Sequence, residues 1–136
     1  MSYIIAYLTF NGNCREAMNF YRDSFGGELY IQTVGESPFS AKMPLQMQDN
    51  IVQATLKNKE LVIMASDFAD DDGIRKGNNI SLMLNCDSKQ YLEQCYERLA
   101  EGCIQRQPIE ETFWGALFGT LTDRYGNPWL FNFQLK

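Results

Sequence analysis

The sequence contains no histidine among its 136 residues, which removes several common catalytic devices at once. Ser-His-Asp and Cys-His mechanisms need an imidazole to carry a proton, and many zinc sites need one as a ligand. Carboxylates and thiolates could still build a metal site, but the commonest protein ligand is missing. The absence therefore excludes imidazole-dependent catalysis and narrows the metal chemistry that the protein could support.

Positive charge is also scarce. The chain has 12 Lys and Arg residues against 17 Asp and Glu residues, so its formal net charge is −5. A surface with this balance repels the phosphate backbone, and we expect no nucleic-acid partner. No apolar stretch approaches the roughly 20 residues of a membrane-spanning helix, and the run MSYIIAYLTF lacks the basic segment of a secretory signal. These features predict a cytoplasmic protein without a membrane span.

Cysteine is present, but not in the spacing of a metal or redox motif. Cys14, Cys86, Cys95 and Cys103 contain no C-x-x-C pair. Reduced thiols are expected in the cytoplasm. Cys14 and Cys95 fall within helical patterns, where a cysteine usually acts as a small buried apolar residue.

The first half of the chain shows the pattern β-α-β-β-β. Residues 3–10 are rich in β-branched and aromatic side chains, as strands are. A helix is predicted to begin at Asn13, whose side chain can cap it with Glu16 three residues on, and to end at 26–27 (Gly-Gly). Further strands are predicted at 28–34, 51–58 and 60–66.

The second half repeats this pattern. A strand at 80–86 precedes a helix capped by Asp87 or Ser88 and running to about Ala100, where 101–102 (Glu-Gly) ends it. One such unit cannot bury both faces of its sheet, so two units must pair within the chain or with another chain. We therefore predict an α+β fold in one domain, 1–136, made of two βαβββ modules at about 3–66 and 80–135. The remaining strands are expected at 103–109, 115–123 and 128–135.

Two segments lie outside the repeat. Residues 35–50 hold two prolines and two methionines without a clear period, and a loop of this length is either functional or a mobile surface insertion. Residues 67–79 are polar and read as a linker between the modules. Its acidic run, 70–72, lacks the ligand spacing of a calcium loop and is predicted to be a solvated turn.

Two stretches of the chain carry a family resemblance. YLTFNGNCREAMNFYRDSFGGEL (7–29) and ETFWGALFGTLTDRYGNPWLFN (111–132) resemble the vicinal oxygen chelate superfamily, which contains glyoxalases, bleomycin-resistance proteins and extradiol dioxygenases. Within it the chain is similar to the PhnB-like branch, often labelled 3-demethylubiquinone methyltransferase-like. The resemblance implies two curled mixed sheets that form a cup around a small-molecule site, and a homodimer.

The resemblance also locates the positions at which metal-dependent members carry His, Gln or Glu ligands. None of the residues at these positions is a ligand of the kind that zinc, nickel or iron needs. We therefore expect no metal and no other cofactor. The four positions fall on Ile5 or Ala6, on Met64, on Asn79 or Ser81, and on Leu130.

Strand alternation then predicts which side chains face the cup. Tyr7 and Trp114 could instead be ordinary core or interface aromatics, and Gln53 and Asn132 could satisfy each other or the backbone. The predicted ligand-binding residues are Tyr7, Thr9, Gln53, Thr55, Met64, Phe113, Trp114, Leu130 and Asn132.

These features favour a protein that binds a small organic molecule in a metal-free cup, as bleomycin-resistance members act by binding alone. The alternative is a metal-independent lyase or isomerase, which would use Asp67 or a tyrosine as acid or base. A metal-dependent glyoxalase- or dioxygenase-type enzyme is less favoured. Methyl transfer is disfavoured because no glycine-rich strand-loop-helix is available to hold S-adenosylmethionine.

Overall fold

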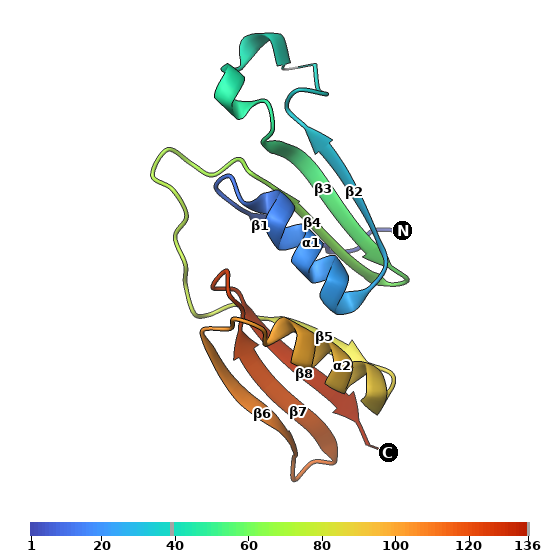
Figure 1. The fold of residues 1–136 in the computed structure, drawn as a ribbon. Helices are drawn as coiled ribbons and strands as arrows, with labels where there is room; N and C mark the ends of the chain where they lie inside the picture. The colour runs from blue at the N-terminus through green and yellow to red at the C-terminus, as the bar shows by residue number, and fades with distance from the viewer. Residues whose placement is uncertain (39, 136) are drawn as a thin grey trace. The chain divides into compact units, whose positions relative to one another are not determined.

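A computed structural model describes residues 1–38 and 40–135 of the chain. It divides into two compact units, Met1–Arg75 and Lys76–Lys136. Each unit contains one α-helix and one mixed four-stranded sheet (Figure 1). The α+β fold predicted from the sequence is confirmed.

Unit 1 contains one sheet with the strand order β1-β4-β3-β2. β1 is parallel to β4, and the other neighbours are antiparallel. Two short 3-10 helices, η1 (Ser40–Lys42) and η2 (Leu45–Met47), lie in the connection between β2 and β3. The main elements are β1 (Ala6–Thr9), α1 (Cys14–Phe25), β2 (Glu28–Thr33), β3 (Ile51–Asn58) and β4 (Leu61–Ser66).

Unit 2 has the same topology, with the strand order β5-β8-β7-β6 and a parallel pair formed by β5 and β8. Each of its strands begins and ends within two residues of the position expected from the sequence. The elements are β5 (Leu82–Cys86), α2 (Lys89–Leu99), β6 (Gln105–Glu111), β7 (Ala116–Thr122) and β8 (Pro128–Gln134).

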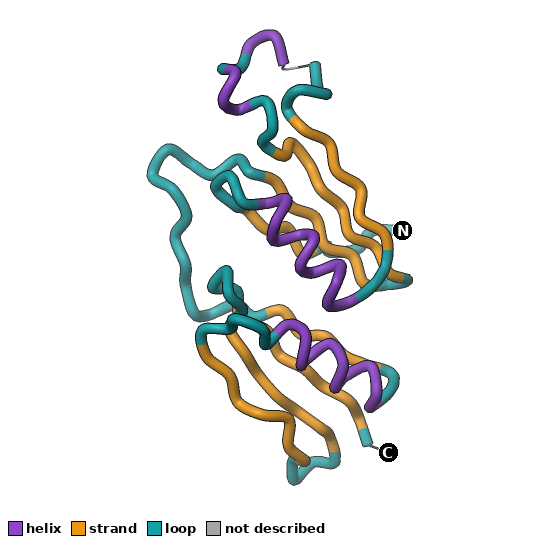
Figure 2. The backbone as a smooth tube through the Cα atoms, in the orientation of Figure 1, coloured by secondary structure: helices purple, strands orange, loops and turns teal. Residues whose placement is uncertain are grey.

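Helix α1 covers one face of the unit 1 sheet (Figure 2) and contacts β2, β3 and β4. Ala17, Met18 and Tyr21 are completely buried on its apolar stripe, at the spacing that places side chains on one side of a helix. The strands meet this stripe with alternate residues, because successive strand side chains point to opposite faces. The buried strand residues include Ala54, Leu56, Ile63 and Ala65.

The start of α1 differs from the prediction. Asn13 makes no side-chain capping hydrogen bond, so the expected capping box with Glu16 is wrong. The carboxylate of Asp67, immediately after β4, takes this role instead: its Oδ1 accepts the backbone N–H of Cys14 at 3.0 Å. A capping group can therefore come from a residue that is distant in the sequence.

Other helix ends match the sequence. Ser88 accepts a hydrogen bond from the backbone N–H of Tyr91 at 3.1 Å, which selects it over Asp87 as the cap of α2. Gly26 ends α1 with φ of 81°, a conformation that costs glycine little.

The core of unit 2 is built around aromatic residues. The rings of Tyr96 and Phe131 meet edge to face with their centroids 5.2 Å apart, and the Tyr96 hydroxyl donates to the carbonyl of Gln107 at 2.7 Å. Trp129 donates its indole N–H to Oδ2 of the buried Asp123 at 2.8 Å. These bonds satisfy the polar groups that aromatic side chains bring into a core.

Across residues 1–38 and 40–135, no helix is both long enough and apolar enough to span a membrane.

Candidate functional site

The sheet of unit 1 presents a row of side chains on the face away from α1. Tyr7 pairs with Met64 across β1 and β4, Met64 with Thr55 across β4 and β3, and Thr55 with Tyr30 across β3 and β2. Side chains paired in this way stand about 5 Å apart. The row therefore forms one continuous strip across all four strands, with an aromatic ring at each end.

Exposure supports this assignment. Tyr7 is 52% and Tyr30 is 57% exposed, although large aromatic side chains are usually buried. Thr9 and Gln53 follow on the same face, two residues along β1 and before Thr55 on β3. We call Tyr7, Thr9, Tyr30, Gln53, Thr55 and Met64 the unit 1 sheet face.

Sequence reasoning placed every member of this face except Tyr30. The sequence contained a signal for Tyr30, because it alternates with the apolar residues Leu29 and Ile31 along β2. In the structure these two neighbours are less exposed than Tyr30. A period of two puts Tyr30 with the polar residues of its strand.

Unit 2 has a corresponding face opposite α2. Leu130 pairs with Met83 on β5 and with Thr120 on β7. Asn132, two residues further along β8 on the same face, donates its amide N–H to Oδ1 of Asn85 at 2.8 Å. Asn132 therefore has a partner within the protein, but this partner is the side chain of Asn85 and not Gln53 or the backbone, the two alternatives offered by the sequence.

Phe113 and Trp114, two of the predicted ligand-binding residues, lie in the turn between β6 and β7. Phe113 is 97% and Trp114 is 55% exposed, and their rings meet edge to face at 5.0 Å. Trp114 also contacts Phe118 of β7 at a centroid distance of 6.4 Å. Trp114 therefore continues the helix-free face of unit 2, and neither ring belongs to the core.

Asp67, at the start of the predicted linker, was a candidate acid or base. Its side chain is buried, with an exposure of 5%. Its Oδ1 accepts the N–H groups of Gly12 and Cys14 at 2.8 and 3.0 Å, and its Oδ2 accepts that of Ile51 at 2.8 Å. Both oxygens hold backbone in place, so this carboxylate acts as a structural link between β4, α1 and β3.

The buried thiols are also unsuited to act as nucleophiles. Burial, with a smaller contribution from the nearby Asp67 carboxylate, raises the pKa of Cys14 to about 12. Burial also raises the pKa of Cys86 to about 12 and that of Cys95 to about 11. A thiol acts as a nucleophile through its thiolate, and these three stay protonated near neutral pH.

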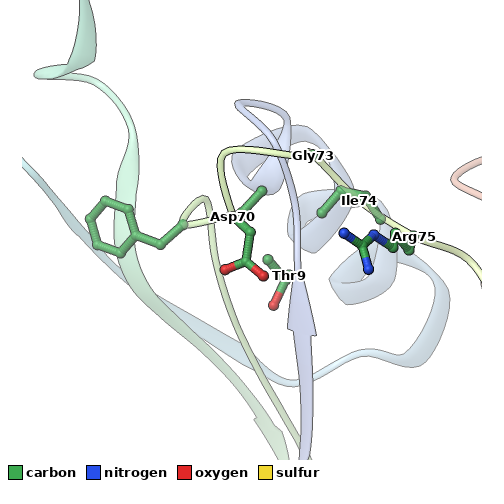
Figure 3. Close-up of a pocket in the computed structure, with 7 residues that line it drawn as sticks. Thr9, Asp70, Gly73, Ile74 and Arg75 are labelled. Carbon is green, nitrogen blue, oxygen red and sulfur yellow. The ribbon is translucent and has the colours of Figure 1, made fainter.

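A pocket of about 320 Å³ lies where β1 ends (Figure 3). Thr9 forms one part of its lining, and the segment after β4 forms the rest. This segment was predicted to be a linker, and no sequence signal indicated that it turns back beside β1. The other lining residues are Phe68, Ala69, Asp70, Gly73, Ile74 and Arg75.

Comparison with known proteins identifies the family. The profile of the 3-demethylubiquinone-9 3-methyltransferase family matches residues 2–132. The chain belongs to this family.

Relatives cover almost the whole chain. Protein YjdN of Escherichia coli K12 is 30% identical over 93% of this chain and 91% of its own length. The crystal structure of protein PA1353 from Pseudomonas aeruginosa is 38% identical, with a TM-score of 0.85 and complete coverage of both chains. A putative 3-demethylubiquinone-9 3-methyltransferase, PhnB protein, from Bacillus cereus is 22% identical with a TM-score of 0.74, covering 97% and 99% of the two chains. The PhnB-like assignment made from the sequence is confirmed.

More distant structures show the wider fold. A glyoxalase/bleomycin resistance protein/dioxygenase family enzyme from Burkholderia phytofirmans is 15% identical, with a TM-score of 0.62 over 96% of this chain and 98% of its own. This member of the 3-demethylubiquinone-9 3-methyltransferase family therefore has the glyoxalase/bleomycin resistance fold.

The donor atoms of this PhnB-like chain do not fit the metal chemistry of that wider group. Met64 and Leu130 lie on the helix-free faces, where a thioether and a hydrocarbon offer no charged or imidazole ligand. Among residues 1–38 and 40–135, no group of three or more Cys, Asp or Glu side chains is arranged to hold a metal ion.

The structure also does not fit the methyl-donor cofactor that the family name implies. Nucleotide-like cofactors bind the free N–H groups of a glycine turn between a strand and a helix. In unit 1 the turn at 11–13 has this position, but Gly12 and Cys14 donate their N–H groups to Asp67. The donors that such a cofactor would need are already engaged by the protein.

Proposed function

We propose that this PhnB-like protein binds a small organic molecule at the helix-free faces of its sheets, without a metal ion. The observation that carries the proposal is the row Tyr7–Met64–Thr55–Tyr30 across all four strands of unit 1. A binding site needs mostly apolar contact area with a few well-placed polar groups. This row supplies two aromatic rings, a thioether and a hydroxyl.

The chemistry of the face favours an uncharged or weakly polar ligand with an unsaturated or ring portion. The rings of Tyr7 and Tyr30 can stack on such a portion, and the flexible side chain of Met64 adapts to its shape. Gln53, Thr55 and Thr9 can donate and accept hydrogen bonds from the same side. None of these groups carries a charge.

Unit 2 has a face of similar character, and we propose it as a second binding surface, with Leu130, Asn132, Phe113 and Trp114 as its ligand-binding residues. Trp114 and Phe113 are both more than half exposed, and large exposed rings are typical of binding surfaces. We propose that the protein works as a homodimer, in which a second copy shields these faces from water. The four free cysteines agree with a cytoplasmic location.

A metal-independent lyase or isomerase would need a carboxylate or phenol that can take a proton from the ligand. Asp67 was the carboxylate proposed for that role, and three backbone N–H groups occupy its two oxygens. Asp67 is therefore unsuited to that role, which leaves a tyrosine of the unit 1 sheet face as the group that such an enzyme would use.

Native mass spectrometry of the purified protein tests the assembly and the occupant together. We expect the mass of two chains plus a retained or added organic molecule, without a metal ion. A single-chain mass at micromolar concentration would contradict the dimer, and a stoichiometric zinc or nickel ion would contradict the metal-free site.

Binding at the unit 1 sheet face can be tested with the fluorescent probe 8-anilino-1-naphthalenesulfonate. Tyr7→Ala should weaken probe binding, because it removes one aromatic end of the row. Tyr3→Ala is the matched control, since Tyr3 is 73% exposed and lies before β1. Equal probe binding by both variants and the unchanged protein would overturn the proposed location.

A further inference from the structure

The pocket at the end of β1 offers a second kind of chemistry. Its lining carries one carboxylate and one guanidinium, from Asp70 and Arg75, whereas the unit 1 sheet face is uncharged. We propose that this pocket binds a small zwitterionic molecule of the amino-acid type, with its ammonium group at Asp70 and Thr9 and its carboxylate at Arg75. The proposal goes beyond the function proposed above, although Thr9 borders both sites.

Backbone hydrogen bonds position the segment after β4 that lines the pocket. At its start, Asp67 is anchored by the three backbone N–H groups described above, and its own N–H donates to the carbonyl of Ile51 at 2.9 Å. The chain then closes a tight turn in which the N–H of Gly73 donates to the carbonyl of Asp70 at 2.8 Å. Gly73 has φ of 83°, which favours glycine at this position. The turn holds Asp70 beside the end of β1.

The acceptors in the pocket are available to a ligand. Figure 3 shows the Asp70 carboxylate directed toward Thr9. Within residues 1–38 and 40–135, no protein group forms a hydrogen bond or ion pair with the Asp70 carboxylate or the Thr9 hydroxyl. An ammonium group, with its three N–H donors, can bind both acceptors.

The guanidinium of Arg75 uses only part of its hydrogen-bond donors within the protein. Arg75 donates from Nη2 to Oδ2 of Asp72 at 2.7 Å, outside the pocket lining. A guanidinium has five N–H donors in a planar fork, so most of them remain for a ligand. Arg75 therefore forms an exposed ion pair with Asp72 and still has donors that can bind a carboxylate.

The size and the apolar part of the pocket narrow the ligand class. A volume of about 320 Å³ lies at the lower end of small-molecule sites. Ile74 and Phe68 are 38% and 43% exposed and provide an apolar surface for a short hydrocarbon chain. A ligand with only one charge would face one like-charged group, whereas a zwitterion satisfies both.

Three probes of matched shape test the proposal by NMR: norleucine, pentylamine and hexanoate. Pentylamine is norleucine without its carboxylate, and hexanoate is norleucine without its ammonium group. We expect norleucine to give saturable shifts of the backbone amides of Gly73 and Ile74. Each single-charge probe should bind about two- to five-fold more weakly, as expected for loss of one exposed ion pair.

Asp70→Asn should reduce norleucine affinity by a similar factor. Asp71→Asn is the matched control, because Asp71 is an exposed neighbour that does not line the pocket, and it should bind as the unchanged protein does. Absent shifts at Gly73 and Ile74, equal binding of the three probes, or equal effects of both substitutions would overturn the proposal. Tyr7→Ala should leave norleucine binding unchanged, so failure at this pocket is distinguishable from failure at the unit 1 sheet face.

Discussion

Oδ1 of Asp67 accepts the backbone N–H of Cys14, 53 positions away in the sequence, at a distance of 3.0 Å. The same carboxylate binds Gly12 before the helix and Ile51 at the start of β3. One side chain thus fixes where α1 begins and how the ends of two strands meet. An anionic group at a helix N-terminus also interacts favourably with the helix dipole.

Asp67→Asn should lower the free energy of unfolding by about 3 kcal/mol, because a buried N–H that loses its acceptor costs 1–3 kcal/mol. The amide nitrogen introduced by asparagine cannot accept a hydrogen bond, so at least one of the three N–H groups loses its partner. Urea denaturation followed by circular dichroism measures the change.

Asp71→Asn serves as the control for charge in that experiment, because Asp71 is exposed. It should change stability by less than about 0.5 kcal/mol. Similar losses for both variants would show that Asp67 does not link the three elements.

Much of the fold could be predicted from local sequence. The alternation in 128–135 predicts that Leu130 and Asn132 share one face of the strand, and in the structure the residues of the other face, Trp129 and Phe131, are buried. The end of α1 at Gly26 could also be predicted, since it depends only on the backbone conformation of that glycine. These predictions succeed because each depends on neighbouring residues alone.

The features that sequence reasoning missed depend on contacts between distant segments. Asn13 is a good capping residue by type, but its side chain makes no capping hydrogen bond, and the carboxylate of Asp67 accepts backbone N–H groups at this end of the helix instead. The pocket beside Thr9 exists because the segment after β4 turns back at Gly73. The acidic run 70–72 was predicted to be a turn, but nothing in the local pattern of 67–75 indicates that this turn lies beside Thr9.

Substitutions of Gly27 and Gly12 separate the cost of a steric clash from the cost of backbone strain. Both have positive φ, 103° and 98°, so alanine is strained at either position. A Cβ at Gly27 would lie 2.5 Å from the carbonyl oxygen of Lys57, whereas at Gly12 no atom of the described chain lies within 4 Å.

Gly12→Ala should therefore cost about 1 kcal/mol of unfolding free energy from strain alone. Gly27→Ala should cost about 3 kcal/mol, because the strand β3 must also move away. Denaturant titrations of both variants measure the difference. Equal losses would contradict the close approach of Gly27 to β3.

The buried thiols predict how stability changes in alkaline solution. Cys14 has a pKa of about 12 in the folded protein, against 9.0 for an ordinary thiol. Above pH 9 the unfolded state therefore binds fewer protons than the folded state, and stability falls as pH rises. Replacing Cys14 with alanine should reduce this slope between pH 9 and pH 11, and an unchanged slope would contradict the assignment.

The same burial predicts the order of cysteine labelling. Cys103 is partly exposed, whereas Cys14, Cys86 and Cys95 are buried. At pH 8, iodoacetamide should modify Cys103 first, and the other three should react only after unfolding. Peptide mass spectrometry identifies the labelled residue. Early labelling of Cys14 in the folded protein would show that its environment is open to solvent.

Metal addition tests the chemistry of the positions occupied by Met64 and Leu130. A metal ion that binds the folded state at 100 times its dissociation constant would add about 2.7 kcal/mol of stability. We expect zinc and nickel, added to chelator-treated protein, to leave the thermal midpoint unchanged, because neither a thioether nor a hydrocarbon replaces imidazole or carboxylate. A Cys103→Ser variant controls for binding by the partly exposed thiol. A stabilisation that persists in this variant, with one metal ion per chain, would show that other side chains form a metal site.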